Sequence, residues 1–254
     1  LFTYINSNYP VSPYKVLIGH SLGGLTAINT LVNNPNLFNA YIAIDPSMWW
    51  NNQFMLKETS KAFNKNEFNN TSLYLAMANT MEKGMDTARV RIDQSKQTLP
   101  IRSILELSDQ LKGSKNKLNY KMQYYNNENH GSIPHIETYD GLRFIFDFYN
   151  LPLTKKDYAD TSMALAYRIE NHYKNISKKM GYTINPSENT LNTLGYNAVY
   201  LKNLNLAEYF FKLNLKNYPE SNNVYDSLGD FYNETGDTKQ AILMYEKALS
   251  LTEN

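Results

Sequence analysis

Short apolar runs alternate with helical patterns along the first 150 residues of the chain. The runs 16–18, 40–44 and 72–78 are each long enough for a strand, and 118–125 alternates apolar with polar residues, which also predicts a strand. Amphipathic or apolar helical patterns separate and follow them, at 25–32, 54–63, 87–112 and 137–149. Regular alternation of strand and helix predicts an α/β fold with a parallel sheet.

The pattern changes after the segment Leu-Pro-Leu at 151–153, beyond which no strand is predicted. One long helix is expected over 158–180, where Gly181 ends it. Residue types then recur at a spacing of 34, the period of a tetratricopeptide helix pair; the matched residues are Leu194, Gly195, Ala207 and Phe211 with Leu228, Gly229, Ala241 and Tyr245. We therefore expect an α/β domain over 1–153 and an all-α domain over 154–254, with tetratricopeptide-like repeats at about 188–221 and 222–254.

Composition excludes several classes of function. Twenty-five basic residues against 24 acidic ones give a net charge of +1, which offers no electrostatic basis for binding nucleic acid. The chain has no cysteine, so disulfides and thiolate metal sites are ruled out. No apolar run is long enough for a membrane span.

The candidate nucleophile lies between the first strand and the first long helix. Residues 19–23 read Gly-His-Ser-Leu-Gly, which fits G-x-S-x-G, and a strand precedes and a helix follows it. Such a nucleophile elbow holds its serine, here Ser21, in a strained turn, where side chains at Gly19 and Gly23 would clash with neighbouring backbone. The backbone N–H of Leu22 can then point at a developing oxyanion near the helix N-terminus.

A serine nucleophile needs a general base, and the chain offers four histidines. His20 is next to Ser21 in the sequence and cannot reach round to it, while His172 lies in the helical domain. His130 and His135 both follow the last strand, where the chain order Ser, Asp or Glu, His of α/β-hydrolases places the base. We favour His130, because Gly131 and Ser132 beside it suit an exposed loop.

The acid that orients the histidine has three candidates. The loop after the strand that precedes the histidine strand holds Glu82 and Asp86, and we place Glu82 first. Asp45, at the end of the strand after the nucleophile, is the second choice. Each could instead be a solvated loop carboxylate, or in the case of Asp45 a turn residue before Pro46. A Ser–His pair without an acid is the remaining arrangement.

Trp49 and Trp50 follow Asp45 at the carboxyl end of a strand, where open α/β sheets bind ligands. Their faces could form the wall of a substrate pocket, or they could belong to the core. Neither a zinc motif nor a Gly-rich phosphate loop occurs in the sequence, so we expect no metal and no other cofactor.

Three blocks of the sequence together resemble the putative-esterase family of α/β-hydrolases, and in particular its enterochelin (siderophore) esterases and IroE-like members. The blocks read GHSLGG, AYIAIDPSMWW and NENHGSIPHIETYDGLRFIF, within a likeness that covers about residues 1–150. The resemblance implies ester hydrolysis with Ser21 as nucleophile and His130 as base. Because α/β-hydrolases carry several strands before the elbow, we also expect N-terminal strands, and any targeting signal before them, to lie outside this sequence. The compartment, cytoplasmic or exported, is therefore left open.

The sequence predicts a serine hydrolase that cleaves a small-molecule carboxylic ester through an acyl-enzyme at Ser21. Two alternatives stay open at this point. One is a non-catalytic adaptor, in which the hydrolase half is a scaffold and the repeats bind a protein partner. The other is an acyltransferase on the same fold, in which an alcohol replaces water.

Overall fold

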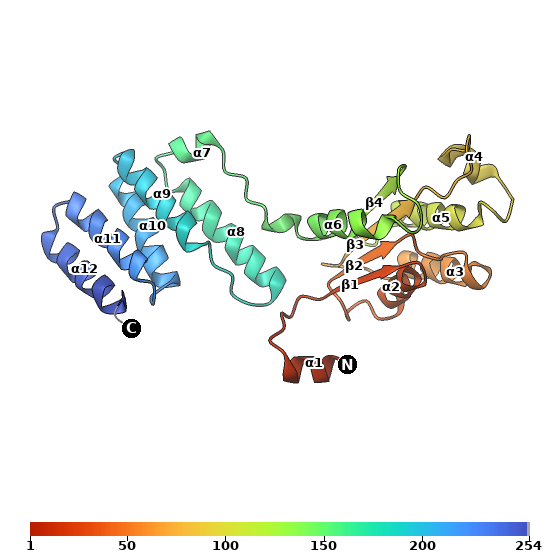
Figure 1. Cartoon of the computed structure of the whole chain (residues 1–254), viewed down its shortest axis with the longest axis horizontal. Coiled ribbons are helices and arrows are strands. Elements are labelled where there is room, and N and C mark those ends of the chain that lie inside the picture. Colours follow the sequence, from red (N-terminus) through yellow and green to blue (C-terminus); the bar gives the residue numbers. More distant parts are fainter. Residues whose placement is uncertain (253–254) are drawn as a thin grey trace. The chain divides into compact units, whose positions relative to one another are not determined.

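The strands form one parallel sheet in the computed structural model, which describes residues 1–252. They lie side by side in chain order (Figure 1), as β1 (Val16–His20), β2 (Ala40–Ile44), β3 (Ser72–Ala78) and β4 (Asn119–Tyr125). In register, Gly19 pairs with Ala43 and Ala43 with Leu75. The carboxyl ends of all the strands therefore lie along one edge of the sheet. Because helices cover both faces, β2 and β3 are buried along their whole length.

Helices on the two faces of the sheet make a three-layer arrangement. The main apolar core lies on one face, between the sheet and α2 (Leu22–Asn33), α3 (Trp50–Lys65) and α5 (Leu99–Gly113), and it contains Ile28, Phe63 and Ile104. The opposite face carries α6 (Ile133–Ile145). Gly141 of α6 lies so close to Ile42 that an added Cβ would come within 2.8 Å of its side chain. The predicted α/β class is thus confirmed.

The long helix expected over 87–112 is wrong, because the chain forms α4 (Thr87–Ile92) and α5 with a loop between them. In that loop the Asp93 carboxylate accepts a hydrogen bond from the Ser95 N–H at 2.6 Å, which favours a turn over a helix. Pro100 lies in the first turn of α5, where its missing N–H loses no helical hydrogen bond.

The helix expected over 158–180 is also divided, into α7 (Lys155–Ala159) and α8 (Ala164–Met180). Asp160 causes the break, since its carboxylate accepts a hydrogen bond from the Ser162 N–H at 2.8 Å. The helix expected over 137–149 instead begins earlier, as α6, and is followed by a 3-10 turn, η1 (Asp147–Tyr149). A short helix, α1 (Phe2–Asn8), precedes the sheet.

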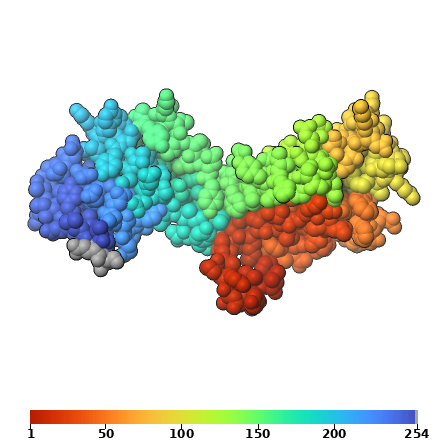
Figure 2. Space-filling view, in the orientation of Figure 1, coloured from red at the N-terminus to blue at the C-terminus, as the bar shows by residue number. Residues whose placement is uncertain are grey.

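The chain divides into two compact units, Leu1–Phe148 and Tyr149–Asn254. The second unit is entirely helical in its described part. After α8 it contains α9 (Glu188–Tyr200), α10 (Leu204–Asn217), α11 (Asn222–Glu234) and α12 (Thr238–Thr252). In the space-filling view of Figure 2, these helices, coloured cyan to blue, form one continuous surface.

Two close crossings of helices in the second unit repeat at the same spacing as the sequence. An added Cβ on Gly195 would lie 2.7 Å from the Phe211 ring, and one on Gly229 would lie 2.6 Å from the Tyr245 ring. Both the glycines (229 − 195 = 34) and the aromatics (245 − 211 = 34) are 34 residues apart. The repeats are thus helix pairs with equivalent contacts, and their tetratricopeptide-like character stays a prediction. The last two residues of the second repeat lie outside the described residues.

Candidate active site

Ser21 lies in a strained turn between β1 and α2. Its φ of +57° and ψ of −116° fall in a region that residues with a side chain rarely adopt. Two hydrogen bonds hold this conformation, because the Ser21 N–H donates to the Ile44 carbonyl and its own carbonyl accepts from the Ser47 N–H, both at 3.0 Å. The turn therefore presents the Ser21 hydroxyl at the carboxyl edge of the sheet.

Of the two elbow glycines expected to prevent a clash, Gly19 does so and Gly23 does not. A Cβ on Gly19 would overlap the backbone carbonyl of Gly23, so only glycine fits there. The expected clash at Gly23 is wrong, since no atom lies within 4 Å of the place where its Cβ would be. The close approach is instead at Gly24, whose Cβ would lie 3.0 Å from Pro46.

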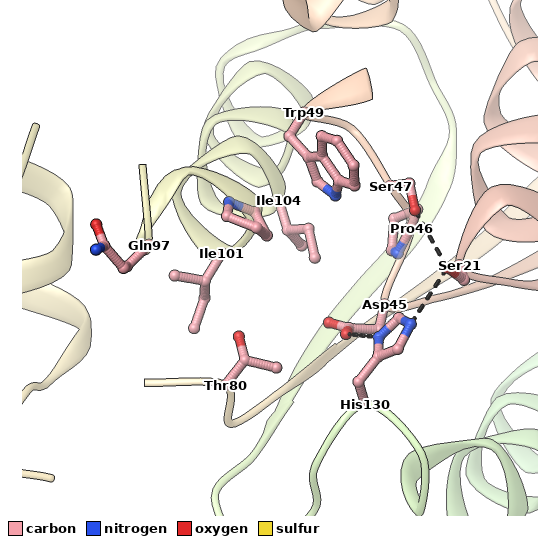
Figure 3. Close-up of a pocket in the computed structure, with 11 residues that line it drawn as sticks. Ser21, Asp45, Pro46, Ser47, Trp49, Thr80, Gln97, Ile101, Ile104 and His130 are labelled. Atoms are coloured by element: carbon pink, nitrogen blue, oxygen red, sulfur yellow. Dashed lines mark hydrogen bonds and ion pairs between the residues drawn. The ribbon is translucent and has the colours of Figure 1, made fainter. Parts of the chain in front are cut away.

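A chain of hydrogen bonds links Ser21, His130 and Asp45 (Figure 3). His130 Nδ1 lies 2.6 Å from Asp45 Oδ2, and His130 Nε2 lies 3.2 Å from Ser21 Oγ. Because the carboxylate can only accept, Nδ1–H donates to it, which leaves Nε2 free to accept from the Ser21 hydroxyl. This is the tautomer that a histidine needs in order to act as a general base on a serine.

Asp45 is held rigidly at the end of β2. It is buried and has a φ of +40°, which turns its side chain along the edge of the sheet. The Ala78 N–H donates to its second oxygen, Oδ1, at 3.0 Å. Both carboxylate oxygens thus have a hydrogen-bond partner, which fixes the orientation of the carboxylate beside His130.

The loop after β4 is braced so that His130 leans over the carboxyl edge. Asn129 caps the turn, as its side-chain oxygen accepts from the N–H groups of Gly131 at 2.8 Å and Ser132 at 3.1 Å. The Asn79 N–H, in the loop after β3, donates to the Glu128 carbonyl at 2.8 Å. These contacts fix the loop in which His130 was predicted.

The carboxylate beside His130 is Asp45 and not Glu82, which the sequence analysis placed first. Glu82 is exposed in the loop after β3, among the residues that line a neighbouring cavity. Asp86 caps the N-terminus of α4, where its carboxylate accepts from the N–H groups of Ala88 and Arg89. The rule of chain order points to the loop after β3, but the contacts of His130 point to the end of β2.

The three other histidines lie away from Ser21 Oγ. His20, at the end of β1, packs its ring against His130 with 4.5 Å between the ring centroids. His135 is exposed on α6, and His172 Nε2 lies 3.2 Å from the Tyr149 carbonyl in the second unit. Of the histidines considered for the base, only His130 is placed to receive the Ser21 proton.

A cavity of about 240 Å³ opens directly over Ser21 and His130. Its apolar wall comes from Pro100, Ile101 and Ile104 of α5, together with Trp49 (Figure 3). Trp50 is not among the lining residues, although its ring packs edge-on against Trp49 with centroids 5.7 Å apart. Of the predicted pair, Trp49 therefore faces the cavity and Trp50 supports it.

Two polar residues that the sequence analysis did not single out lie close to the site. Ser47 is buried, with its hydroxyl 3.2 Å from Ser21 Oγ. Glu137 of α6 is completely buried, and neither of its carboxyl oxygens has a hydrogen-bond partner. Burial, together with the negative charge of Asp45, raises the pKa of Glu137 to about 9, so it is a neutral acid at pH 7. Nothing in the local sequence marks Ser47 or Glu137 as a residue close to the site.

Among the described residues, no group of three or more histidine, aspartate or glutamate side chains is arranged to hold a metal ion. In the same part of the chain, none of the helices combines the length and apolar character needed to cross a membrane.

The profile of a protein family described as "Esterase: Putative esterase" matches residues 1–147. Among curated proteins, the chain is 38% identical over 64 residues to ferri-bacillibactin esterase BesA of Bacillus subtilis, which is 25% of this chain and 22% of that protein. It is 47% identical over 45 residues to the siderophore enterobactin esterase of Emericella nidulans, 18% of this chain and 15% of that protein. The chain thus matches less than a quarter of the length of these relatives.

An IroE-like serine hydrolase from Shewanella oneidensis has a similar solved structure. The TM-score is 0.58 at 24% identity, over 85% of this chain and 63% of that chain. At this identity the likeness supports the fold and not the chemistry.

Proposed function

We propose, because the chain belongs to the putative esterase family, that it hydrolyses a carboxylic ester with Ser21 as nucleophile, His130 as general base and Asp45 as the orienting acid. The single observation that carries this proposal is the hydrogen-bonded chain from Ser21 Oγ through the His130 ring to Asp45. The chain of bonds lies in a cavity that can admit a substrate.

Acylation begins when Ser21 Oγ attacks the carbonyl carbon of the ester and its proton passes to His130 Nε2. Asp45 keeps the other proton on Nδ1 and stabilises the imidazolium that forms. Leu22 is the first residue of α2, so its N–H has no partner within the helix and can donate to the oxyanion. The bond to the alcohol then breaks, and His130 Nε2 gives the proton to the leaving oxygen.

Deacylation repeats these steps with water. His130 Nε2 removes a proton from the water as its oxygen attacks the acyl carbon, and the same proton returns to Ser21 Oγ as the acid leaves. Ser47 helps in both halves. When the Ser21 hydrogen points at His130, Ser47 is the donor to Ser21 Oγ, which keeps the nucleophile aligned with the base.

The names of the relatives suggest which esters to test first. Two curated relatives are named as esterases of ferri-bacillibactin and of the siderophore enterobactin. A siderophore ester is therefore the first class of substrate to offer, alongside simple esters that report on the site itself.

Replacement of Ser21 by alanine tests the proposal. Loss of the nucleophile should lower kcat/KM for p-nitrophenyl acetate by about 10⁴-fold or more, because only binding and oxyanion stabilisation are left. Labelling by a fluorophosphonate probe should disappear in the same variant. Ser221→Ala is the matched control, since that serine lies in the second unit and makes no side-chain cap bond. Hydrolysis by Ser21→Ala at the rate of the unmodified chain would refute the mechanism.

For the second unit we propose a tetratricopeptide-like array that binds a protein partner. The equivalent contacts of Gly195 with Phe211 and of Gly229 with Tyr245 support the array. None of the residues proposed for ester hydrolysis lies in this unit, so binding there and hydrolysis in the first unit can be tested separately.

A further inference from the structure

Two cavities adjoin at the active site and share part of their walls. The near cavity, described above, lies over Ser21 and His130, and a far cavity of about 400 Å³ lies beside it. Both are lined by Thr80, Gln97 and Ile101. Figure 3 shows these three side chains across the near cavity from Ser21 and His130. The two cavities are therefore adjacent, and these side chains lie where they adjoin.

The lining of the far cavity is linked to the loop that carries His130. Thr80 begins its lining, and the neighbouring Asn79 is hydrogen-bonded to Glu128 in the loop that carries His130. In the mechanism proposed above, His130 gives a proton to the oxygen of the leaving alcohol. The alcohol half of the ester must then lie next to His130, and its continuation leads towards the far cavity.

The lining of the far cavity indicates the kind of group that it accepts. Met81, Met85 and Ile101 give it apolar surface, and Thr80, Ser95, Gln97 and Thr98 add uncharged polar groups. Its charged side chains are Glu82 and Asp93, with no lysine or arginine among the lining residues. The hydrogen bond from the Ser95 N–H lowers the pKa of Asp93, so this carboxylate is ionised at pH 7. An anionic ligand would be repelled here.

We propose, on the basis of the esterase function above, that the far cavity binds the alcohol half of an extended, uncharged ester, and that Ile101 and Gln97 determine how long that half can be. Ile101 is a buried residue of α5, and Gln97 is an exposed residue of the loop that precedes this helix. A larger side chain at either position would fill space where the two cavities adjoin.

Selectivity between short and long esters is the kinetic test. The substrates are ethyl acetate and 2-(2-ethoxyethoxy)ethyl acetate, which differ only in an uncharged extension of the alcohol. In Ile101→Phe and in Gln97→Trp, the ratio of kcat/KM for the long ester to that for the short one should fall about 10-fold. The exposed position of Gln97 makes the second variant informative if the first packs poorly. Gln94→Trp is the matched control, because exposed Gln94 lines neither cavity.

Two further substrate comparisons separate the halves of the ester and the effect of charge. Ethyl octanoate differs from ethyl acetate by a longer acyl half. The ratio of kcat/KM for ethyl octanoate to that for ethyl acetate should stay unchanged in both variants, while the ratio for the long and short alcohols falls. The acetate ester of 6-hydroxyhexanoate carries a carboxylate on its alcohol half and should be a poorer substrate than the uncharged long ester. Glu82→Gln should reduce that difference.

A binding measurement keeps this proposal separate from the proposed function. In Ser21→Ala, isothermal titration calorimetry with the two acetate esters gives their dissociation constants without turnover. The long ester should bind to Ser21→Ala more tightly than the short one, and Gln97→Trp in the same chain should remove this difference. That result supports the alcohol site even if the unmodified chain hydrolyses neither ester. Equal effects of Gln97→Trp and Gln94→Trp, or a change confined to the octanoate comparison, would overturn it. Ser21-independent hydrolysis would instead overturn the proposed mechanism alone.

Discussion

The two units of this chain differ in where their backbone is strained and in which polar groups they bury. In the first unit, Ser21 and Asp45 both have positive φ values at the carboxyl edge of the sheet. Among the described residues of the second unit, Lys202 is the one residue other than glycine with a positive φ. Buried carboxyl groups follow the same division, since Asp45 and Glu137 belong to the first unit and the second buries the uncharged Asn214 and Ser227.

This difference indicates where the chemistry lies. Strain and buried charge each lower stability, so a chain retains them mainly where a function requires them. The helix pairs of the second unit form where the sequence pattern predicts them and bury no carboxyl group among their described residues, as expected of a scaffold or binding surface. The comparison therefore predicts that changes in the strained region alter the reaction, while changes at the helix crossings alter only stability.

The largest expected effect is the loss of the base. His130→Ala should lower kcat/KM for p-nitrophenyl acetate by about 10⁴-fold or more, and its combination with Ser21→Ala should be no worse than either change alone. Residues that act as one unit give such non-additive losses. His135→Ala is the control, and the exposed side chain on α6 should be dispensable. If His135→Ala were the damaging change, the assignment of the base would be wrong.

Removal of the charge on Asp45 should come next. Asp45→Asn is expected to lower kcat by about 10³- to 10⁴-fold with little change in KM, because the amide favours the wrong tautomer of His130. Glu82→Gln and Asp86→Asn serve as controls for p-nitrophenyl acetate, since neither side chain is hydrogen-bonded to His130. A mild effect of all three changes would indicate a Ser–His pair that works without an acid.

The elements of this site differ in how far the sequence could predict them. The Ser21 elbow is a local arrangement, so the G-x-S-x-G spacing between a strand and a helix is enough to find it. The loop of His130 follows from the order of elements along the chain. The acid does not, because it depends on which strand end lies nearest to the histidine ring. A positive φ turns Asp45 towards His130, and no residue pattern signals that angle.

The polar residues around the nucleophile were hidden for a related reason. Ser47 meets Ser21 only because β1 and β2 pair in a particular register. Glu137 follows a helical pattern that would equally suit a solvent-exposed residue, and its burial depends on how α6 lies on the sheet. In the same way, apolar periodicity predicted the helices but not the breaks at Asp93 and Asp160, where a carboxylate accepts from a backbone N–H.

Substitutions at the helix crossings of the second unit test the prediction that changes there alter only stability. Gly195→Ala and Gly229→Ala should each destabilise that unit by about 1–3 kcal/mol, since the new methyl group would overlap an aromatic ring. Gly195→Ala should be the worse of the two, because Phe211 is fully buried and Tyr245 is not. Thermal unfolding measures the effect, and kcat/KM for p-nitrophenyl acetate should stay unchanged.

The exposed Asn233 of α11 provides the control for these crossings, since Asn233→Ala adds no group to the interior. A large loss of esterase activity in Gly195→Ala, with the first unit still folded, would contradict the separation of roles. It would mean that the helical unit helps to build the site.

The last expected effect concerns Glu137 and depends on pH. Burial raises the pKa of Glu137 to about 9 in the folded chain, above the value of about 4.5 for an exposed glutamate. The unfolded chain therefore releases this proton first as the pH rises. The stability that the protonated group contributes is complete below pH 4.5 and is lost progressively up to about pH 9. Glu137→Gln is neutral at every pH and should escape this loss.

The midpoint of thermal unfolding of Glu137→Gln should equal that of the unmodified chain near pH 4.5 and exceed it by about 10 °C or more near pH 9. Glu106→Gln, at an exposed position on α5, should show no such divergence. Curves that stay parallel from pH 4.5 to pH 9 would mean that Glu137 titrates as an exposed group and is not buried in solution. Divergence would instead show that Glu137 is a buried acid that lowers the stability of the first unit as it ionises.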